Sequence, residues 1–323
     1  MTRPTVTIIL AIGVLAGTTA LASAVELPCR SVRVIVPANA GGITDLETRI
    51  VADIANRRGA SPTLQAVNIG GQGGIEGGRA LRDADPDGCT LMYAHMNPML
   101  FYITGRIDVN YWDYEPIALM TSSWRMLGAS RQAPYDDLRE MVEYAREHGE
   151  GSVVAGATIG ATSHFQLLLV EQEGDFKFNI VSYSGGRERI TALLADNIQV
   201  SDIGTTEAAQ YVRQGQLKAL ALMGPERSDV LPDVPTTGEL GFDSQFSISH
   251  GFYAPQGTPE DIIAYYAELF REVAEDPDFA ERVGVNDTEV THMGPAEYRA
   301  YLDQQFETMR DLAIAIDAYT PQN

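Results

Sequence analysis

The chain has 323 residues, of which 23 are basic and 44 are acidic, and its formal net charge at pH 7 is −21. That charge argues against nucleic acid and anionic membrane surfaces as partners, although a local site for a small anion is compatible with it. The length suits one large domain or two of ordinary size.

The first 24 residues have the pattern of a secretory signal peptide. One basic residue, Arg3, precedes an apolar run from Val6 to Leu21, and the small residues Ala22-Ser23-Ala24 follow. The run is shorter than the ~20 residues that a membrane-spanning helix needs. We therefore expect a secreted chain that starts near Val25, with a short membrane anchor as the alternative. Without Arg3 the chain has 22 basic and 44 acidic residues, a net charge of −22.

The first predicted unit is a strand, a small-residue loop and a helix. The β-branched run Val32–Val36 ends at Pro37, and the loop 38–42 is Ala-Asn-Ala-Gly-Gly. Thr44 and Glu47 have the T-x-x-E spacing of a capping box, so we expect them to cap the following helix. That helix has its apolar residues on one face, namely Leu46, Ile50, Val51 and Ile54.

The two cysteines each lie just before a predicted strand. Cys29 precedes the strand 31–37, and Cys89 precedes the strand 90–94. If these strands are parallel neighbours, both cysteines lie at the same end of the sheet. Because a secreted chain meets an oxidising compartment, we predict a Cys29–Cys89 disulfide, with two free buried thiols as the alternative.

The order of strand, small-residue loop and helix recurs along the chain. Strands are predicted at 152–155, 180–183 and 198–203, and each is followed by a Gly/Ser/Thr loop and a helix. Ser163 and Gln166 again have capping-box spacing, and further helices begin after Pro259 and at Pro295. This alternation predicts an α/β protein whose parallel sheets are covered on both faces, with the ligand crevice at the carboxyl ends of the strands.

Three of the predicted helix starts suit the binding of an anion. They are 41–45, 160–163 and 184–186, where glycine and hydroxyl residues enter a helix. Free backbone N–H groups and the positive end of the helix dipole favour a negative ligand there. Ordinary helix caps and turns are the alternative interpretation, and cap side chains would use some of the same amides.

Enzyme and metal motifs are absent from the sequence. The segment 71–76 begins like a dinucleotide loop, but Glu76 stands where the third glycine belongs. The five histidines show no metal-ligand spacing, so we expect no metal and no cofactor. His164 could orient the loop before it, but we favour a partly buried cap residue whose hydrogen bonds are satisfied. Asp45 and Asp202 could form a catalytic pair, but we favour Asp45 as a tether of its loop and Asp202 as an acceptor at a strand end.

The motifs also resemble those of a known family, the substrate-binding receptors of tripartite tricarboxylate transporters. The segment 34–45, Val-Ile-Val-Pro through Gly-Gly-Ile-Thr-Asp, resembles the family's opening motif. Further matches follow in the same order over the whole mature chain: Asn68 to Gly74, Asp85 to Leu91, Gly160 to His164, Ser182 to Gly186, Leu231 to Gly241, and Phe252 to Pro259.

The resemblance implies a type II periplasmic-binding-protein fold, in which two α/β lobes are joined by two crossing strands. Lobe I would contain 25–122 and 247–323, and lobe II would contain 123–246. It implies a monomeric periplasmic receptor, not an enzyme, that captures a small carboxylate and delivers it to membrane permease subunits. The implied ligand contacts are Ala38, Asn39, Ala40, Gly41, Gly42, Thr44, Asp45, Gly73, His95 and Asn97 in lobe I, and Thr158, Gly160, Thr162, Ser163, His164, Tyr183, Ser184, Gly185 and Asp202 in lobe II.

Several positions depart from the family pattern, so the ligand class stays open among aliphatic, aromatic and amino acids. The loop Ala38-Asn39-Ala40 is small and polar, and Ser182 and Ser184 replace the family's Pro and Lys. Arg187 or Arg189 could supply the lost positive charge, or could face solvent. Two other functions remain open: an enzyme of the same fold that uses Asp45, His164 or Asp202, and a sensor for a signalling partner.

Overall fold

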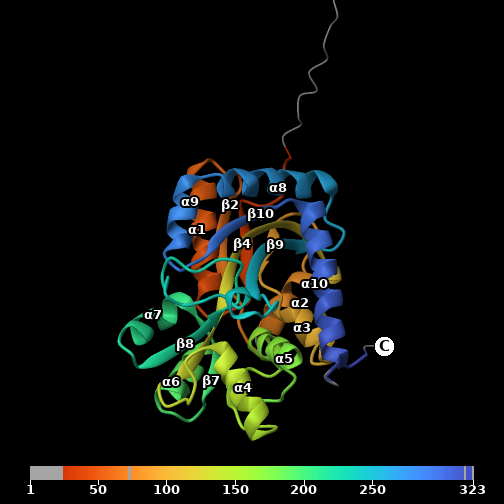
Figure 1. Ribbon diagram of the computed structural model, residues 1–323. Coiled ribbons are helices and arrows are strands. Elements are labelled where there is room, and N and C mark those ends of the chain that lie inside the picture. Colours follow the sequence, from red (N-terminus) through yellow and green to blue (C-terminus); the bar gives the residue numbers. More distant parts are fainter. Residues whose placement is uncertain (1–24, 72–73, 316–317, 322–323) are drawn as a thin grey trace, which may run out of the picture.

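The computed structural model describes residues 25–71, 74–315 and 318–321 (Figure 1). The predicted signal peptide and Gly73 lie outside these residues. The described strands belong to one mixed sheet. They are β1 (Ser31–Val36), β2 (Thr63–Asn68), β3 (Thr90–Ala94), β4 (Tyr114–Ser130), β5 (Val154–Ala157), β6 (Asn179–Ser182), β7 (Val200–Gly204), β8 (Leu217–Leu222), β9 (Ser247–Pro255) and β10 (Glu289–Met293).

Helices follow most of these strands, as the strand–loop–helix pattern predicted. They are α1 (Ile43–Arg57), α2 (Ile75–Arg82), α3 (Asn97–Ile103), α4 (Leu138–His148), α5 (Thr162–Gly174), α6 (Gly186–Leu194), α7 (Thr205–Arg213), α8 (Glu260–Ala274), α9 (Pro277–Gly284) and α10 (Pro295–Ala315), with short 3-10 turns η2 (Tyr111–Asp113) and η3 (Gly238–Leu240). None of the described helices is long and apolar enough to cross a membrane.

Strand β4 runs through both halves of the molecule. Its residues 114–124 pair with β9, and its residues 125–129 pair with β7, so its partner changes between Trp124 and Arg125. On one side of this change β1 is parallel to β2 and β3, and on the other β5 is parallel to β6 and β7. We call these the first half and the second half.

The predicted parallel pairing is present among β1, β2 and β3 and among β5, β6 and β7, but the strands that cross between the halves run against their neighbours. β4 is antiparallel to β7, β8, β9 and β10, and β9 is also antiparallel to β3. The strand order is therefore β2-β1-β3-β9-β4-β7-β5-β6, with β8 and β10 also paired with β4.

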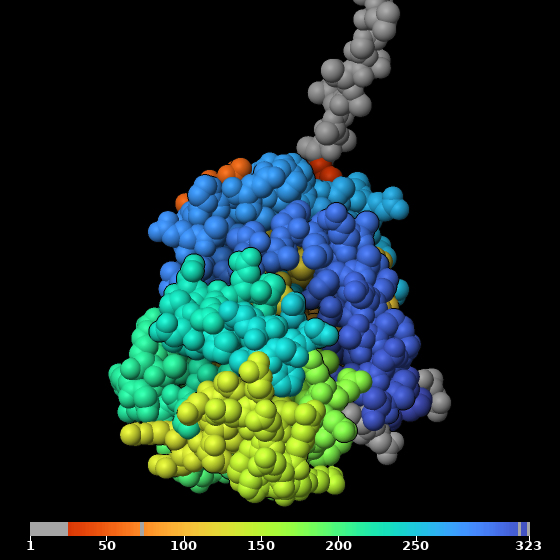
Figure 2. Space-filling model, in the orientation of Figure 1, coloured from red at the N-terminus to blue at the C-terminus, as the bar shows by residue number. Residues whose placement is uncertain are grey.

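Apolar residues pack against both faces of the sheet. In β1, Val32, Val34, Ile35 and Val36 are all buried, the near-continuous apolar run that a strand covered on both faces requires. Helices α1, α8 and α9 contact one another, and α10 contacts both α3 and α5. In Figure 2 the blue C-terminal residues form the top and right of the view, and the surface is hollowed where they meet the cyan and green residues below.

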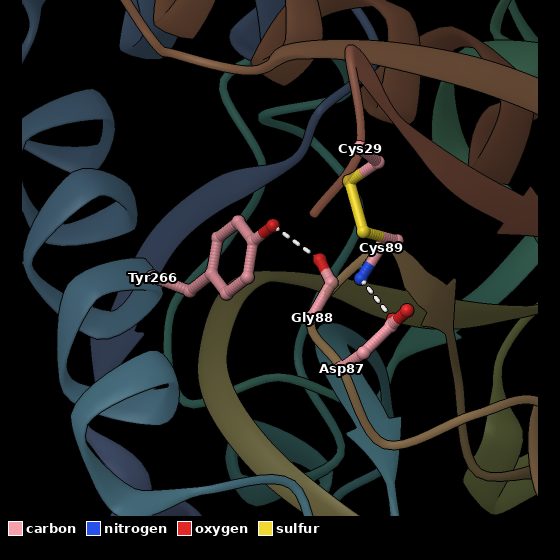
Figure 3. Close-up of a disulfide and its surroundings, with 5 residues drawn as sticks. All are labelled: Cys29, Asp87, Gly88, Cys89 and Tyr266. Carbon is pink, nitrogen blue, oxygen red and sulfur yellow. Dashed lines mark hydrogen bonds between the residues drawn. A yellow bond between two sulfur atoms is a disulfide. The ribbon is translucent and has the colours of Figure 1, made fainter. Parts of the chain in front are cut away.

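Cys29 and Cys89 form a disulfide beside the first half's sheet (Figure 3). Cys29 precedes β1 and Cys89 precedes β3, and the two strands are parallel neighbours. The two Cα atoms are 5.9 Å apart. Asp87 accepts a hydrogen bond from the Cys89 amide, and Tyr266 of α8 donates one to the Gly88 carbonyl. The disulfide thus links the segment before β1 to the turn before β3, and α8 is hydrogen-bonded to the same turn.

Candidate ligand-binding site where the halves meet

Helix α1 begins without a side-chain cap. Gly42 is the N-cap residue, and no described side chain accepts a hydrogen bond from the first amides of the helix. The predicted capping box was wrong, because its two residues have buried partners elsewhere. Thr44 Oγ1 lies 3.1 Å from His250 Nε2, and the Glu47 side chain lies in the protein interior. The first turn of α1 therefore keeps its amide N–H groups free of side-chain caps.

Asp45 holds the exposed loop 38–42 in place. Its carboxylate accepts hydrogen bonds from the Gly41 amide at 2.9 Å, Arg49 Nε at 3.0 Å and Asn68 Nδ2 at 3.0 Å. Burial acts to raise the pKa of Asp45, but these hydrogen bonds lower it on balance. Gly41 has a φ of +84°, a conformation that glycine adopts without strain. The carboxylate is therefore ionised and fixes the loop's turn.

A buried polar cluster lies beneath the start of α1. Glu47 is 2 % exposed, and its Oε2 accepts hydrogen bonds from Tyr93 and from Thr121, both at 2.8 Å. His250 Nδ1 is 3.4 Å from the same oxygen. Because burial disfavours the ionised carboxylate, the pKa of Glu47 is raised to about 7.

Two histidines in this region are neutral at physiological pH. Burial, followed by the charge of Arg125, lowers the pKa of His250 to about 3. Burial, followed by His250 and Arg125, lowers the pKa of His95 to about 3. The two rings meet edge to face with centroids 5.2 Å apart. His95 thus reaches the α1 start indirectly, through His250 and Thr44.

Replacing Glu47 with glutamine is expected to change the pH dependence of stability. A carboxyl with a raised folded-state pKa stabilises the fold below its unfolded pKa of 4.5, and this contribution is lost as pH rises through about 7. The loss is about 3 kcal/mol. Urea unfolding between pH 4.5 and 8 should therefore show Glu47→Gln gaining stability relative to the native protein as pH rises.

Both proteins also lose stability as pH falls below 6.5, because His95 and His250 bind protons in the unfolded state while they stay neutral in the folded state. Only the difference between the two proteins therefore reports on Glu47. Glu281 is exposed, so the control variant Glu281→Gln should show the same dependence of stability on pH as the native protein. Parallel profiles for Glu47→Gln and the native protein would contradict the assignment.

A buried ion cluster occupies the corresponding place in the second half. Asp202 of β7 is 2 % exposed. Arg125 Nε and Nη2 donate to its two oxygens at 2.8 and 3.1 Å, and Arg189 Nη2 donates to Oδ2 at 3.0 Å. Arg189 Nη1 also donates to Thr158 Oγ1 at 3.2 Å. Burial raises the pKa of Asp202, but the two guanidinium groups lower it on balance, so the carboxylate is ionised.

The loop before α5 is organised by two side chains of the helix. Ser163 Oγ accepts a hydrogen bond from the Thr158 amide at 2.9 Å, and His164 Nδ1 accepts one from the Gly160 amide at 3.2 Å. Burial lowers the pKa of His164, which favours the neutral, accepting ring. The predicted Ser163/Gln166 capping box was wrong, because Ala161 is the N-cap residue and Gln166 is fully buried.

The start of α5 contacts the first half directly. Asn97 Oδ1 of α3 accepts a hydrogen bond from the Thr162 amide at 3.2 Å. Arg106, which follows α3, donates to the Ile159 carbonyl. The Asn97 oxygen of the first half therefore lies at the N-terminus of α5, where an anion would bind favourably.

The start of α6 is capped by its own acid. Glu188 accepts hydrogen bonds from the Ser184 amide at 3.1 Å and the Ser184 hydroxyl at 2.6 Å. Gly185 is the N-cap residue, and the Tyr183 amide belongs to the sheet through its bond to the Ala157 carbonyl. The carboxylate of Glu188 therefore already occupies part of this predicted anion site.

The structure brings together only part of the predicted contact set. Asn97 meets Thr162, Thr44 connects to His95 through His250, and Thr158 connects to Asp202 through Arg189. No hydrogen bond links the loop 38–42 to the second half among the described residues. The three groups considered for acid–base catalysis, Asp45, His164 and Asp202, each have internal partners, as described above. In the part of the chain described, no group of histidine, cysteine and acidic side chains could hold a metal.

Sequence reasoning missed Arg125 and the buried role of Glu47. Arg125 lies in the run Trp124-Arg125-Met126-Leu127, where a charge inside an apolar strand was the available signal. Its partner Asp202 is 77 residues away, and no local spacing connects the two.

Comparisons with known proteins give a consistent result. The profile of the tripartite tricarboxylate transporter family receptor matches residues 48–317. The UPF0065 protein in the gbd 5' region of Cupriavidus necator is 28% identical over 294 residues, which are 89% of this chain and 88% of that protein.

Solved structures show the same fold. The periplasmic binding protein BugD superposes with a TM-score of 0.75 at 26% identity, covering 90% of this chain and 99% of that one. MatC from Rhodopseudomonas palustris, with bound malate, superposes with a TM-score of 0.74 at 27% identity, covering 88% and 99%. The predicted periplasmic-binding-protein fold is thereby confirmed.

Proposed function

Because the chain belongs to the tripartite tricarboxylate transporter receptor family, we propose that it captures a small carboxylate in the periplasm and delivers it to a tripartite tricarboxylate-type membrane transporter. The family and its structural neighbours are solute-binding receptors, not enzymes. We further propose that residues 1–24 are a cleaved signal peptide and that the receptor is a monomer.

The proposed lobes follow the change of partner in β4. Lobe I contains 25–122 and 247–323, and lobe II contains 123–246. The change of strand partner between Trp124 and Arg125 supports the first boundary, and the start of β9 at Ser247 supports the return. A ligand held by both lobes favours the closed state by the contacts that only this state supplies.

The contact between Asn97 and Thr162 is the observation that carries the proposed chemistry. The Thr162 amide at the start of α5 donates a hydrogen bond to an oxygen from the opposite lobe, as it would to a ligand carboxylate at a helix N-terminus. The contacts named from the resemblance, Gly73 included, remain the proposed lining of the site. Asp45 and Asp202 act indirectly in this proposal, by holding the loop 38–42 and the two arginines.

A thermal-shift screen of the purified protein against a carboxylate library tests the proposed function. At least one acid should raise the melting temperature, because a ligand that binds only the folded state stabilises it. Titration calorimetry then gives the affinity. A library of aliphatic, aromatic and amino acids that leaves the melting temperature unchanged would contradict the proposal.

Two substitutions test the proposed site with the best acid of that screen. Thr162→Ala removes a hydroxyl at the start of α5, and Asp45→Ala releases the loop 38–42. Each should weaken binding by about two- to tenfold, the effect of one hydrogen bond, and should leave the fold intact. Thr308→Ala is the matched control, because within the described part of the chain its hydroxyl bonds to a carbonyl of its own helix, α10. Unchanged affinity in both test variants would contradict the site assignment.

A further inference from the structure

Two guanidinium groups share one carboxylate in the second half. The side chains of Arg125 and Arg189 are 15% and 6% exposed, and that of Asp202 is 2% exposed. Burying an unbalanced charge costs several kcal/mol unless a further partner compensates it. The three groups together carry one excess positive charge. Glu207 acts electrostatically on both arginines, but its side chain is exposed on α7, where water and salt screen it.

The arginines lie at the ligand-binding edge of the sheet. Arg125 pairs with Gly204, which ends β7, and ligands of α/β proteins bind beyond the carboxyl ends of parallel strands. Arg189 reaches Thr158, which follows the neighbouring strand β5. The charge of Arg125 also lowers the pKa of His95 and of His250, so its guanidinium lies near these two first-half side chains.

Arg125 retains a free donor. Its Nε and Nη2 bond to Asp202, whereas its Nη1 has no hydrogen bond to any described residue. A Cβ at Gly204 would lie 3.2 Å from Nη1 and 3.4 Å from Glu207 Oε2, so the missing side chain of this glycine leaves Nη1 uncovered on that side. The neighbouring His95 and His250 are neutral and bring no negative charge to this place.

We propose that Arg125 and Arg189 form an anion-binding subsite for a second anionic group of the ligand, so that the receptor selects dianionic over monoanionic acids. This inference rests on the proposed function, in which a first carboxylate binds at the helix starts. A planar guanidinium with a free N–H suits an ionised carboxylate far better than a neutral amide. Asp202 positions the two arginines and takes no direct part in binding.

The native protein provides the first test. Titration calorimetry compares straight-chain dicarboxylates from malonate to suberate, and the phthalate isomers, with the mono-amide of each. The two members of a pair differ in one ionised group. The best-binding diacid should bind at least about tenfold more tightly than its mono-amide, as one charge-assisted contact implies. Equal affinities would overturn the subsite.

Substitutions of Arg125 provide the second test. Arg125→Gln leaves Asp202 paired with Arg189 and should reduce the ratio of diacid to mono-amide affinity to near one. Arg125→Lys retains the charge and should retain most of the preference. Arg131→Gln removes an equal charge from an exposed residue of the second half and should keep the native ratio. A ratio that falls equally in Arg131→Gln, or that persists in Arg125→Gln, would overturn the subsite.

The experiments distinguish failure of the arginine subsite from failure of the proposed receptor function. If acids bind but the preference does not depend on Arg125, only the subsite is wrong. If neither diacids nor monoacids bind in the full library, the proposed function fails and the subsite fails with it.

Discussion

Replacing Asp202 with alanine is expected to destabilise the protein by about 3–5 kcal/mol. The substitution leaves the guanidinium groups of Arg125 and Arg189 buried without their counter-ion. Each arginine also loses its charge-assisted hydrogen bonds to Asp202. The free energy of unfolding in urea, measured at pH 7, gives the loss directly.

Two further variants separate this burial effect from the loss of any ion pair. Glu239→Ala breaks the exposed pair with Arg227 and should cost far less than Asp202→Ala. Arg125→Gln retains one arginine for one carboxylate and should fall between the two. If Asp202→Ala is no more damaging than Glu239→Ala, the cluster is not the buried charge that its geometry indicates.

Removal of the disulfide should lower the free energy of unfolding by about 4 kcal/mol. The bridge closes a loop with a sequence separation of 60, and closing a loop of this length restricts the unfolded chain. The double variant Cys29→Ser with Cys89→Ser, compared with the native protein in urea without reductant, measures the effect.

Reductant supplies the control for that measurement. It should destabilise the native protein by a similar amount and leave the double variant unchanged. Thiol titration of the unfolded, unreduced native protein should find no free thiol. Two free thiols, or a double variant as stable as the native protein, would contradict the bridge.

Local patterns were sufficient to predict the repeated units of the fold. The β-branched run before Pro37 became β1, and a turn precedes each of α5 and α6 as expected, although β5 continues to Ala157 and α6 already begins at Gly186. These features depend on neighbours along the chain, where turn and strand preferences act. The overall lobed fold followed from motifs that matched a family in order.

The capping boxes failed because competing partners lie far away in sequence. Glu47 meets Tyr93 and Thr121 across separations of 46 and 74 residues, and Thr44 meets His250 across 206. A four-residue motif shows which side chains could cap a helix, but it does not show which side of the helix faces the core. For the same reason Arg125 was not predicted, although its distant partner Asp202 was.

Helix α10 constrains how the two halves can move. It packs against α3 of the first half and α5 of the second, and its Met309 and Leu312 share one apolar cluster with Phe165. A pure rotation about β4 and β9 would pull these side chains apart and expose them to water. A movement that separates the two halves would therefore have to break the contact between α10 and α5 or let the two helices slide along each other.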